Sequence, residues 1–221
     1  MSAPKKKPSL LVAILISAAL SLAVNGVRLV GELQGWAPEV FNREGGGGGS
    51  PLGITWLVLP FGFWFGRVLA KNGSRPRSNA LALLLPLVAA AAVAGLFVLA
   101  FATLWKEPRT GEDWVTLTCT VQLAGAVAGL ATLIAWPRAW VALVFYGILA
   151  RLPVIAIQYY SIVKGWDVHF AKGPPGMPDD VVLFALTLAQ STIWPLGWTP
   201  IAGGLAAAIG ALTVKRGGKP G

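Results

Sequence analysis

The sequence predicts an all-α protein, a polytopic transmembrane helix bundle of about six spans that forms a single domain over residues 1–221. Hydrophobic residues make up 55% of the chain and charged residues 12%, roughly half of the charged share of soluble domains. Long apolar runs recur along the chain, and basic residues cluster between them, as topology signals do. Because so few polar side chains cannot cover a soluble globule, we expect the chain in a lipid bilayer.

The first span is predicted at about 10–30, directly after the basic start MSAPKKKPS. This start, the apolar stretch and Ser21-Leu22-Ala23 also resemble a secretory signal with its cleavage site. However, about 18 residues precede Arg28 in the apolar stretch, enough to span a bilayer, and this favours an uncleaved helix. A flexible, Gly-rich outer loop is predicted at 32–51, where the run Gly45–Gly49 is either natural or an engineered linker.

Four further spans are predicted from apolar runs of suitable length, at about 52–69, 80–104, 115–135 and 141–163. The loop between the second and third spans is strongly basic, and a tight turn with tryptophans joins the fourth to the fifth. An outer loop rich in Gly and Pro covers 164–180. The spacing of Gly125 and Gly129 in the fourth span predicts close packing of two helices within the chain.

The last apolar run, Val181 to Val214, has 34 residues and is too long for one straight span. A break is predicted at Trp194, Pro195, Gly197 and Pro200, because prolines remove backbone donors and kink helices. One alternative is an interfacial lead-in helix followed by a kinked sixth span at about 190–214. The other is a discontinuous helix whose unwound middle lines a site.

Charge predicts the orientation of the chain. With both termini in the cytoplasm, all nine Asp and Glu residues fall outside, and 11 of the 18 Lys and Arg residues fall inside. These eleven are Lys5, Lys6, Lys7, Arg67, Lys71, Arg75, Arg77, Arg138, Lys215, Arg216 and Lys219. Since Lys and Arg decide topology, we expect a multi-pass protein of a bacterial cytoplasmic (inner) membrane with both termini cytoplasmic.

Arg151 is the most informative polar residue, because it lies near the middle of the fifth predicted span. A central arginine costs about 2.5–3.5 kcal/mol on insertion scales, so it should point into the bundle and find acceptors. The candidate binding residues beside Arg151 are Gln122, Gln190, Asn25 and Gln158. These amides either hydrogen-bond between helices as structural contacts, or line an outward-open cavity that holds an anionic group against Arg151.

Several classes of site are not expected. No Asp or Glu is predicted within any span, which argues against a carboxylate proton relay and against cation binding in the membrane. The single histidine, His169, lies in the outer loop, and a metal site there would need ligands such as Asp179 or Asp180. Cys119 is expected to be a buried, inert thiol. Because no catalytic or cofactor-binding motif is found, no catalytic residue, metal or cofactor is predicted, and the chain is expected not to be an enzyme.

The stretch Arg151-Leu-Pro, followed by Gly165-Trp166-Asp167-Val168-His169, resembles a stretch in uncharacterised multipass membrane proteins of bacteria. The resemblance covers about twenty residues and implies no function.

Three classes of function follow. A structural or accessory subunit of a membrane assembly fits the small loops and the missing catalytic groups. A small-solute or anion transporter or channel fits Arg151 and the broken last helix. A membrane-embedded lipid enzyme fits least, because no acid–base pair is visible. Expected partners are membrane lipids and other membrane subunits or a second copy; nucleic acid is not expected, because the basic residues form no single face.

Overall fold

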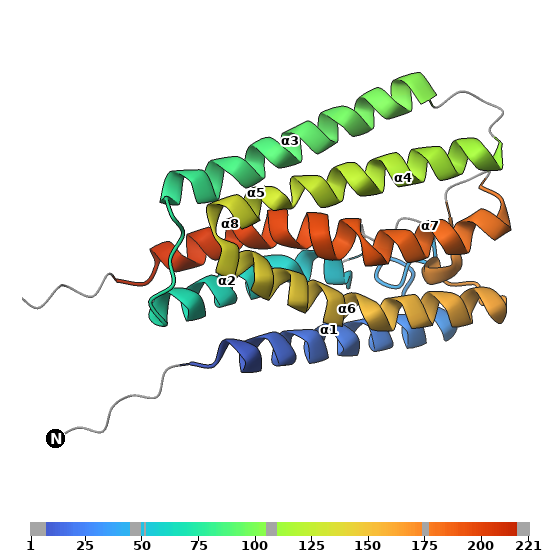
Figure 1. The fold of residues 1–221 in the computed structure, drawn as a ribbon. Coiled ribbons are helices and arrows are strands. Elements are labelled where there is room, and N and C mark those ends of the chain that lie inside the picture. Colours follow the sequence, from blue (N-terminus) through green and yellow to red (C-terminus); the bar gives the residue numbers. More distant parts are fainter. Residues whose placement is uncertain (1–7, 45–49, 51, 105–109, 174–176, 216–221) are drawn as a thin grey trace, which may run out of the picture.

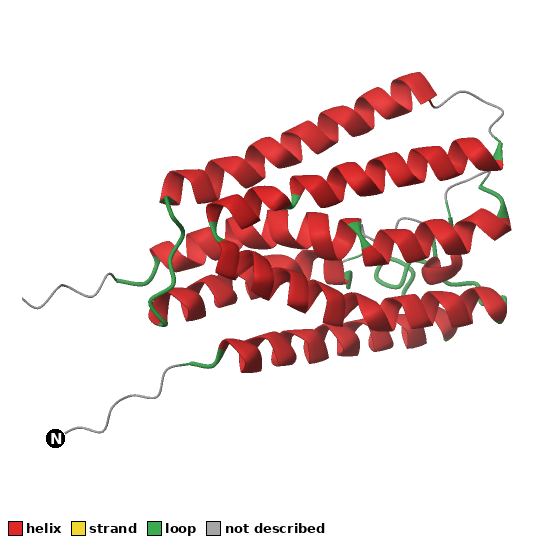
Figure 2. Cartoon of the chain, in the orientation of Figure 1, coloured by secondary structure: helices red, strands yellow, loops and turns green. Residues whose placement is uncertain are grey.

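A computed structural model shows a bundle in which long helices run side by side from one end to the other (Figure 1). It describes all residues except 1–7, 45–49, 51, 105–109, 174–176 and 216–221. The elements are α1 (Leu10–Leu33), α2 (Ile54–Lys71), α3 (Asn79–Leu104), α4 (Gly111–Ala128), α5 (Leu130–Ala135), α6 (Pro137–Val163), the 3-10 turn η2 (His169–Ala171), α7 (Asp179–Ser191), the π-helical segment η3 (Ile193–Trp198) and α8 (Thr199–Leu212). The described residues contain helices and loops but no strand (Figure 2), so the predicted all-α class is confirmed.

Five stretches of the described residues are long and apolar enough to cross a membrane. They are Leu10–Leu33, Asn79–Ala100, Gly111–Ala135, Pro137–Val163 and Asp180–Leu212. The remaining predicted span corresponds to α2, which is not among them because its 18 residues include Pro60, Arg67 and Lys71. By this measure the described chain has five candidate spans, with α2 as a further helix of the bundle.

Small residues hold α2 inside the bundle, along α8. A Cβ atom on Gly62 would lie 2.5 Å from the carbonyl oxygen of Gly203, and one on Gly66 would overlap the carbonyl of Ala207. Close backbone approach of this kind is typical of packing between membrane helices. The same helix buries Val58 and Phe65 completely or nearly so. In contrast, α1 and α3 lie at the edges of the bundle (Figure 1).

The first helix is longer than predicted. α1 continues past residue 30 to Leu33, so Glu32 is helical and the loop predicted at 32–51 begins two residues later. Gly35 ends the helix with a left-handed backbone, φ +66°, and the Trp36 N–H donates to the Gly31 carbonyl at 2.8 Å. This glycine-dependent cap lies beyond the charged residues, which is why hydropathy alone ended the span too early.

The last apolar run forms a discontinuous helix. α7 packs lengthwise against α4 and α6 instead of lying apart as an interfacial lead-in. Thr192 leaves the helical conformation (φ −123°, ψ −81°), and η3 then leads into α8, which has Pro200 in its first turn. The predicted break residues Trp194, Pro195 and Gly197 therefore lie in η3. The helix is broken, as in the second alternative, but its middle is π-helical and packed on neighbouring backbones rather than unwound around a site. The residues Asp180–Leu212 together form one candidate span.

Both ends of the described chain leave the same end of the bundle, as Figure 1 shows. The predicted linker run Gly45–Gly49 and the basic residues at 5–7, 216 and 219 lie outside the described residues. Cys119 is exposed on α4, so the prediction of a buried thiol is wrong; its side chain lies on a side of α4 that no other described helix covers.

Candidate functional site

The buried face of α1 is polar. Ser17, Ser21, Asn25, Arg28 and Glu32 are all buried, and their spacing of three or four residues places them on one side of the helix. Large apolar side chains of the same helix, such as Leu20 and Leu22, are exposed. This inversion is expected where lipid is the solvent, because polar groups must find partners inside the protein.

Within the membrane part of this face, serine hydroxyls make short contacts. Ser17 Oγ donates to the carbonyl of Ala13 at 2.9 Å, and Ser21 Oγ donates to that of Ser17 at 2.9 Å. Ser21 Oγ also lies 2.9 Å from the Tyr146 hydroxyl of α6. The Tyr146 ring packs edge-on against Phe61 and Phe65. These contacts hold α1 against α6 and α2.

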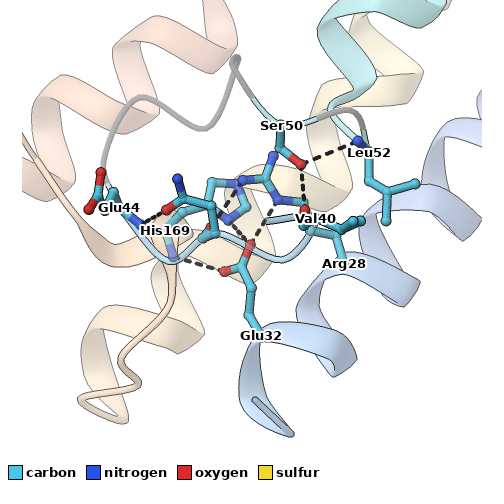
Figure 3. Close-up of polar contacts among 8 residues, drawn as sticks. Arg28, Glu32, Val40, Glu44, Ser50, Leu52 and His169 are labelled. Atoms are coloured by element: carbon cyan, nitrogen blue, oxygen red, sulfur yellow. Dashed lines mark hydrogen bonds and ion pairs between the residues drawn. The ribbon is translucent and has the colours of Figure 1, made fainter. Parts of the chain in front are cut away.

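At the end of the face, Glu32 is fully buried and has partners from two parts of the chain (Figure 3). Arg28 Nε donates to Glu32 Oε1 at 2.8 Å, from one helical turn earlier. The His169 backbone N–H donates to Glu32 Oε2 at 2.9 Å, and His169 Nδ1 lies 2.5 Å from Glu32 Oε1. We call Arg28, Glu32 and His169 the end cluster. It fixes η2 against the last turn of α1.

The end cluster also contacts the first part of the loop that follows α1, at Asn42. Arg28 Nη2 donates to the carbonyl of Asn42 at 3.4 Å, and Asn42 Oδ1 accepts from the Glu44 backbone N–H at 2.6 Å. Ser50 Oγ donates to the Val40 carbonyl at 2.8 Å (Figure 3). The buried ion pair thus contacts two loops that are far apart in sequence, at Asn42 and at His169.

Glu32 corrects one prediction. A carboxylate does lie within a candidate span, because α1 extends beyond the predicted end at residue 30 to Leu33. His169 of the outer loop is bound to this carboxylate. Glu32 and His169 form an acid–base pair, although sequence analysis found none. The expectation that the chain is not an enzyme stays a prediction. It can no longer be supported by the lack of an acid–base pair.

Burial lowers the pKa of His169 below its usual value, and the positive charge of Arg28 lowers it further, while the contact with Glu32 opposes both. The imidazole is therefore neutral at neutral pH. Because a carboxylate only accepts hydrogen bonds, Nδ1 carries the proton and Nε2 is left as an acceptor. The His169–Glu32 pair could therefore accept a proton at Nε2. A metal site is a separate matter: no group of three His, Cys, Asp or Glu side chains that could hold a metal occurs in the described part of the chain.

Arg151 lies in the middle of α6 and is not part of the end cluster. Its exposed fraction is 7%. Its Nη1 donates to Gln190 Oε1 of α7 at 3.1 Å. Its guanidinium carbon lies 4.4 Å from the centre of the Trp194 ring in η3, a cation–π contact. The structure thus brings together Arg151, Gln190 and Trp194, which we call the central arginine site.

The other predicted binding residues have different surroundings. Gln122 accepts a hydrogen bond from Thr192 Oγ1 at 3.3 Å, beside the break between α7 and η3. Asn25 and Gln158 are buried, and neither Asn25 Nδ2 nor Gln158 Oε1 has a hydrogen-bond partner among the described residues. No described hydrogen bond connects these three residues to Arg151.

The break residues pack tightly on neighbouring backbones. A Cβ atom on Gly197 would lie 2.5 Å from the Gly125 carbonyl oxygen, and one on Gly147 would lie 2.9 Å from Pro195 Cα. Pro200 contributes its carbonyl, which accepts from Thr132 Oγ1 at 2.7 Å. The two close approaches pack η3 against α4 and α6, and the hydrogen bond joins α5 to the first turn of α8.

The end cluster could not be found from hydropathy, but part of it was visible in the sequence. The spacing of Arg28 and Glu32 by four residues is that of an ion pair on one helix face. No local signal indicates His169 as the third member, because the loop at 164–172 must fold back onto α1 to bring it there. No family model, curated protein or solved structure matches this chain.

Proposed function

We propose that this chain is a non-enzymatic accessory component of a membrane assembly, and that α3 is the helix that contacts a second membrane protein. The observation that carries the proposal is the packing of α3. Only 11% of its most apolar stretch is buried, against 39% for α6. Among the five candidate spans of the described residues, α3 has the smallest buried share.

Among the described side chains, the buried residues of α3 lie in its first turns, and near its far end only the partly buried Ala100 packs on the cluster of Trp114, Leu117 and Val181. Ala82 packs with Ala135 and Ala208, and Pro86 is fully buried. Beyond this point the side chains are mostly exposed, including Val88, Val98 and other large apolar residues. Figure 1 shows α3 at the edge of the bundle, diverging from its neighbours. Most of its surface is therefore available to lipid or to another protein.

Two features of α3 favour a protein helix as its neighbour. Gly95 is exposed, and nothing lies within 4 Å of the position that its Cβ would occupy, so another backbone could approach closely. A groove of about 230 Å³ runs between α3 and α4. Its lining is apolar apart from Thr103 and Thr120. A ridge of side chains from a partner helix would fit this groove.

The polar groups inside the bundle support the same proposal. The end cluster and the contact of Arg151 with Gln190 are used to hold helices and loops of this chain together. Interhelical hydrogen bonds are a normal means of stabilising membrane proteins. Their geometry gives the buried charges Arg28 and Glu32, and the Arg151 guanidinium, partners within this chain without a substrate.

Photo-crosslinking tests the proposal in intact membranes. A photoreactive residue at Val98 of α3 should capture a second protein, whereas one at Leu20 on the exposed face of α1 should capture lipid only. Gly95→Leu should abolish the protein crosslink. Gly26→Leu is the matched control, since nothing lies near either glycine's Cβ position. Lipid adducts alone at Val98, or a product of two copies of this chain, would contradict the accessory role.

The proposed location is the cytoplasmic (inner) membrane of a bacterium, with both termini in the cytoplasm. The distribution of Lys and Arg supports this orientation. Alkaline phosphatase inserted after Lys172 should be active, and green fluorescent protein fused after Gly221 should fluoresce. The opposite pair of results would reverse the topology.

A second candidate function, transport of a small solute or anion, is favoured by one observation, the positive charge of Arg151 deep in the bundle. Flux into liposomes distinguishes it from the accessory role. Anion uptake by the wild type that Arg151→Gln removes would favour transport.

A further inference from the structure

The charge of Arg151 lies deep in the membrane. In α6, 14 residues precede Arg151 and 12 follow it, which places it about 18–21 Å along the axis from each end. Since the hydrocarbon core is about 30 Å thick, this position is near the bilayer centre. Lipid headgroups are therefore too far away to balance the charge.

No carboxylate of the described residues balances it either. Among the described ion pairs, Glu32 is paired with Arg28 and His169, and Asp167 with Arg43 and Lys172. Arg151 is in contact instead with a neutral amide and an aromatic ring. These groups orient the guanidinium and stabilise it by their dipoles, but they leave one net positive charge inside the bundle.

The central arginine site has unused donors. A guanidinium carries five N–H donors, yet Arg151 makes one hydrogen bond to the described part of the chain. Gln190 uses its carbonyl oxygen in that bond, which leaves the two N–H donors of its amide nitrogen outside this contact. Trp194 covers a face of the guanidinium, so a further ligand would approach along the edge of the plane. Arg151 and Gln190 remain 7% and 8% exposed, so neither is sealed completely.

We propose that the central arginine site binds one small monovalent anion, with Arg151 as the charged donor and the Gln190 amide as a second donor. One charge needs to be balanced, and the small residual exposure favours a compact ion such as chloride over a large one. Charge-assisted hydrogen bonds from arginine are strong where water is excluded. The proposal is independent of the contact that α3 makes.

The test uses the full chain in lipid nanodiscs, with chloride replaced by gluconate at constant ionic strength. Because an anion that binds only the folded state stabilises it, the melting temperature should rise steadily between about 1 and about 100 mM chloride. Arg151→Gln should melt at the same temperature in both salts, whatever its own stability. Arg75→Gln is the matched control, since Arg75 contacts the Ala211 and Val214 carbonyls at the end of the bundle. It should keep the response to chloride.

Binding of ³⁶Cl⁻ to the wild type is a direct second measurement and does not depend on any variant folding. The wild type should bind one equivalent of chloride saturably. Gln190→Leu should weaken this binding about tenfold, because the variant lacks the amide donor to the anion. Equal melting temperatures of the wild type in chloride and gluconate, together with no saturable ³⁶Cl⁻ binding, would overturn the proposal. So would a chloride response that persists in Arg151→Gln.

Discussion

Arg28 and Arg151 are both buried in helices of the bundle, but only Arg28 has a carboxylate beside it. Arg28 donates to Glu32 at 2.8 Å, and His169 contacts the same carboxylate. Arg151 has the amide of Gln190 and the ring of Trp194. The first arginine lies near a helix end, where loops fold back, and the second lies in the middle of a span.

This difference follows from where polar residues are available. Near a helix end, an acidic residue one turn away and a loop histidine can reach the guanidinium without crossing the membrane. In the middle of a span, insertion disfavours a second charge, so the neighbours are neutral. The end cluster is therefore expected to be an electrostatic unit that needs all its members, whereas the central arginine site tolerates replacement by apolar residues.

The largest loss of stability is expected for Glu32→Gln. Removing the carboxylate leaves Arg28 buried without its counter-charge, which costs about 3–5 kcal/mol in known cases. Thermal unfolding in detergent micelles measures this loss. Asp167→Asn is the control, because the Asp167 pairs with Arg43 and Lys172 are exposed, and its stability should stay at the wild-type value. Equal behaviour of the two variants would show that the end cluster contributes nothing.

A smaller effect is expected for Arg151→Leu. The variant leaves Gln190 buried without its partner, at a cost of about 1–3 kcal/mol. Arg151→Leu combined with Gln190→Leu should recover most of this loss, since two apolar groups of suitable size replace a polar pair. A double variant that is far less stable than Arg151→Leu alone would contradict the claim that the central arginine site, unlike the end cluster, tolerates apolar replacements.

The smallest effect concerns pH. Because the pKa of His169 is lowered in the folded chain from the usual value of 6.5, the unfolded chain binds its proton at higher pH. The contribution of neutral His169 to the free energy of unfolding is complete above pH 6.5. It falls as the pH drops below 6.5, by at most about 1.4 kcal/mol per pH unit. Unfolding between about pH 5 and 7 should show this slope in the wild type and not in His169→Gln. A slope that survives in the variant would assign it to another group.

Composition and hydropathy were sufficient to predict the all-α bundle. They placed α3 within one residue of its first position, because apolar runs of that length have few other structures. They failed at Glu32, since a charged residue ends an apolar run but does not end a helix. The actual end depends on the backbone conformation of Gly35, three residues later.

The central arginine site was only partly predictable. Depth along the helices ranks Gln190 as a candidate acceptor for Arg151, and the two are in contact. Depth cannot separate Gln190 from Gln122, Asn25 and Gln158, because the rotation of each helix about its axis is set by packing. The stacking of Trp194 on Arg151 depends on η3, whose π-helical form has no simple sequence signal.

A double-mutant cycle on Arg28 and Glu32 tests the central comparison most directly. It compares Arg28→Gln, Glu32→Gln and the double variant by thermal unfolding in the same micelles. If the pair is a neutralised unit, the double variant should be more stable than Glu32→Gln alone, with a coupling free energy of about 2 kcal/mol or more. Losses that simply add in the double variant would contradict the account.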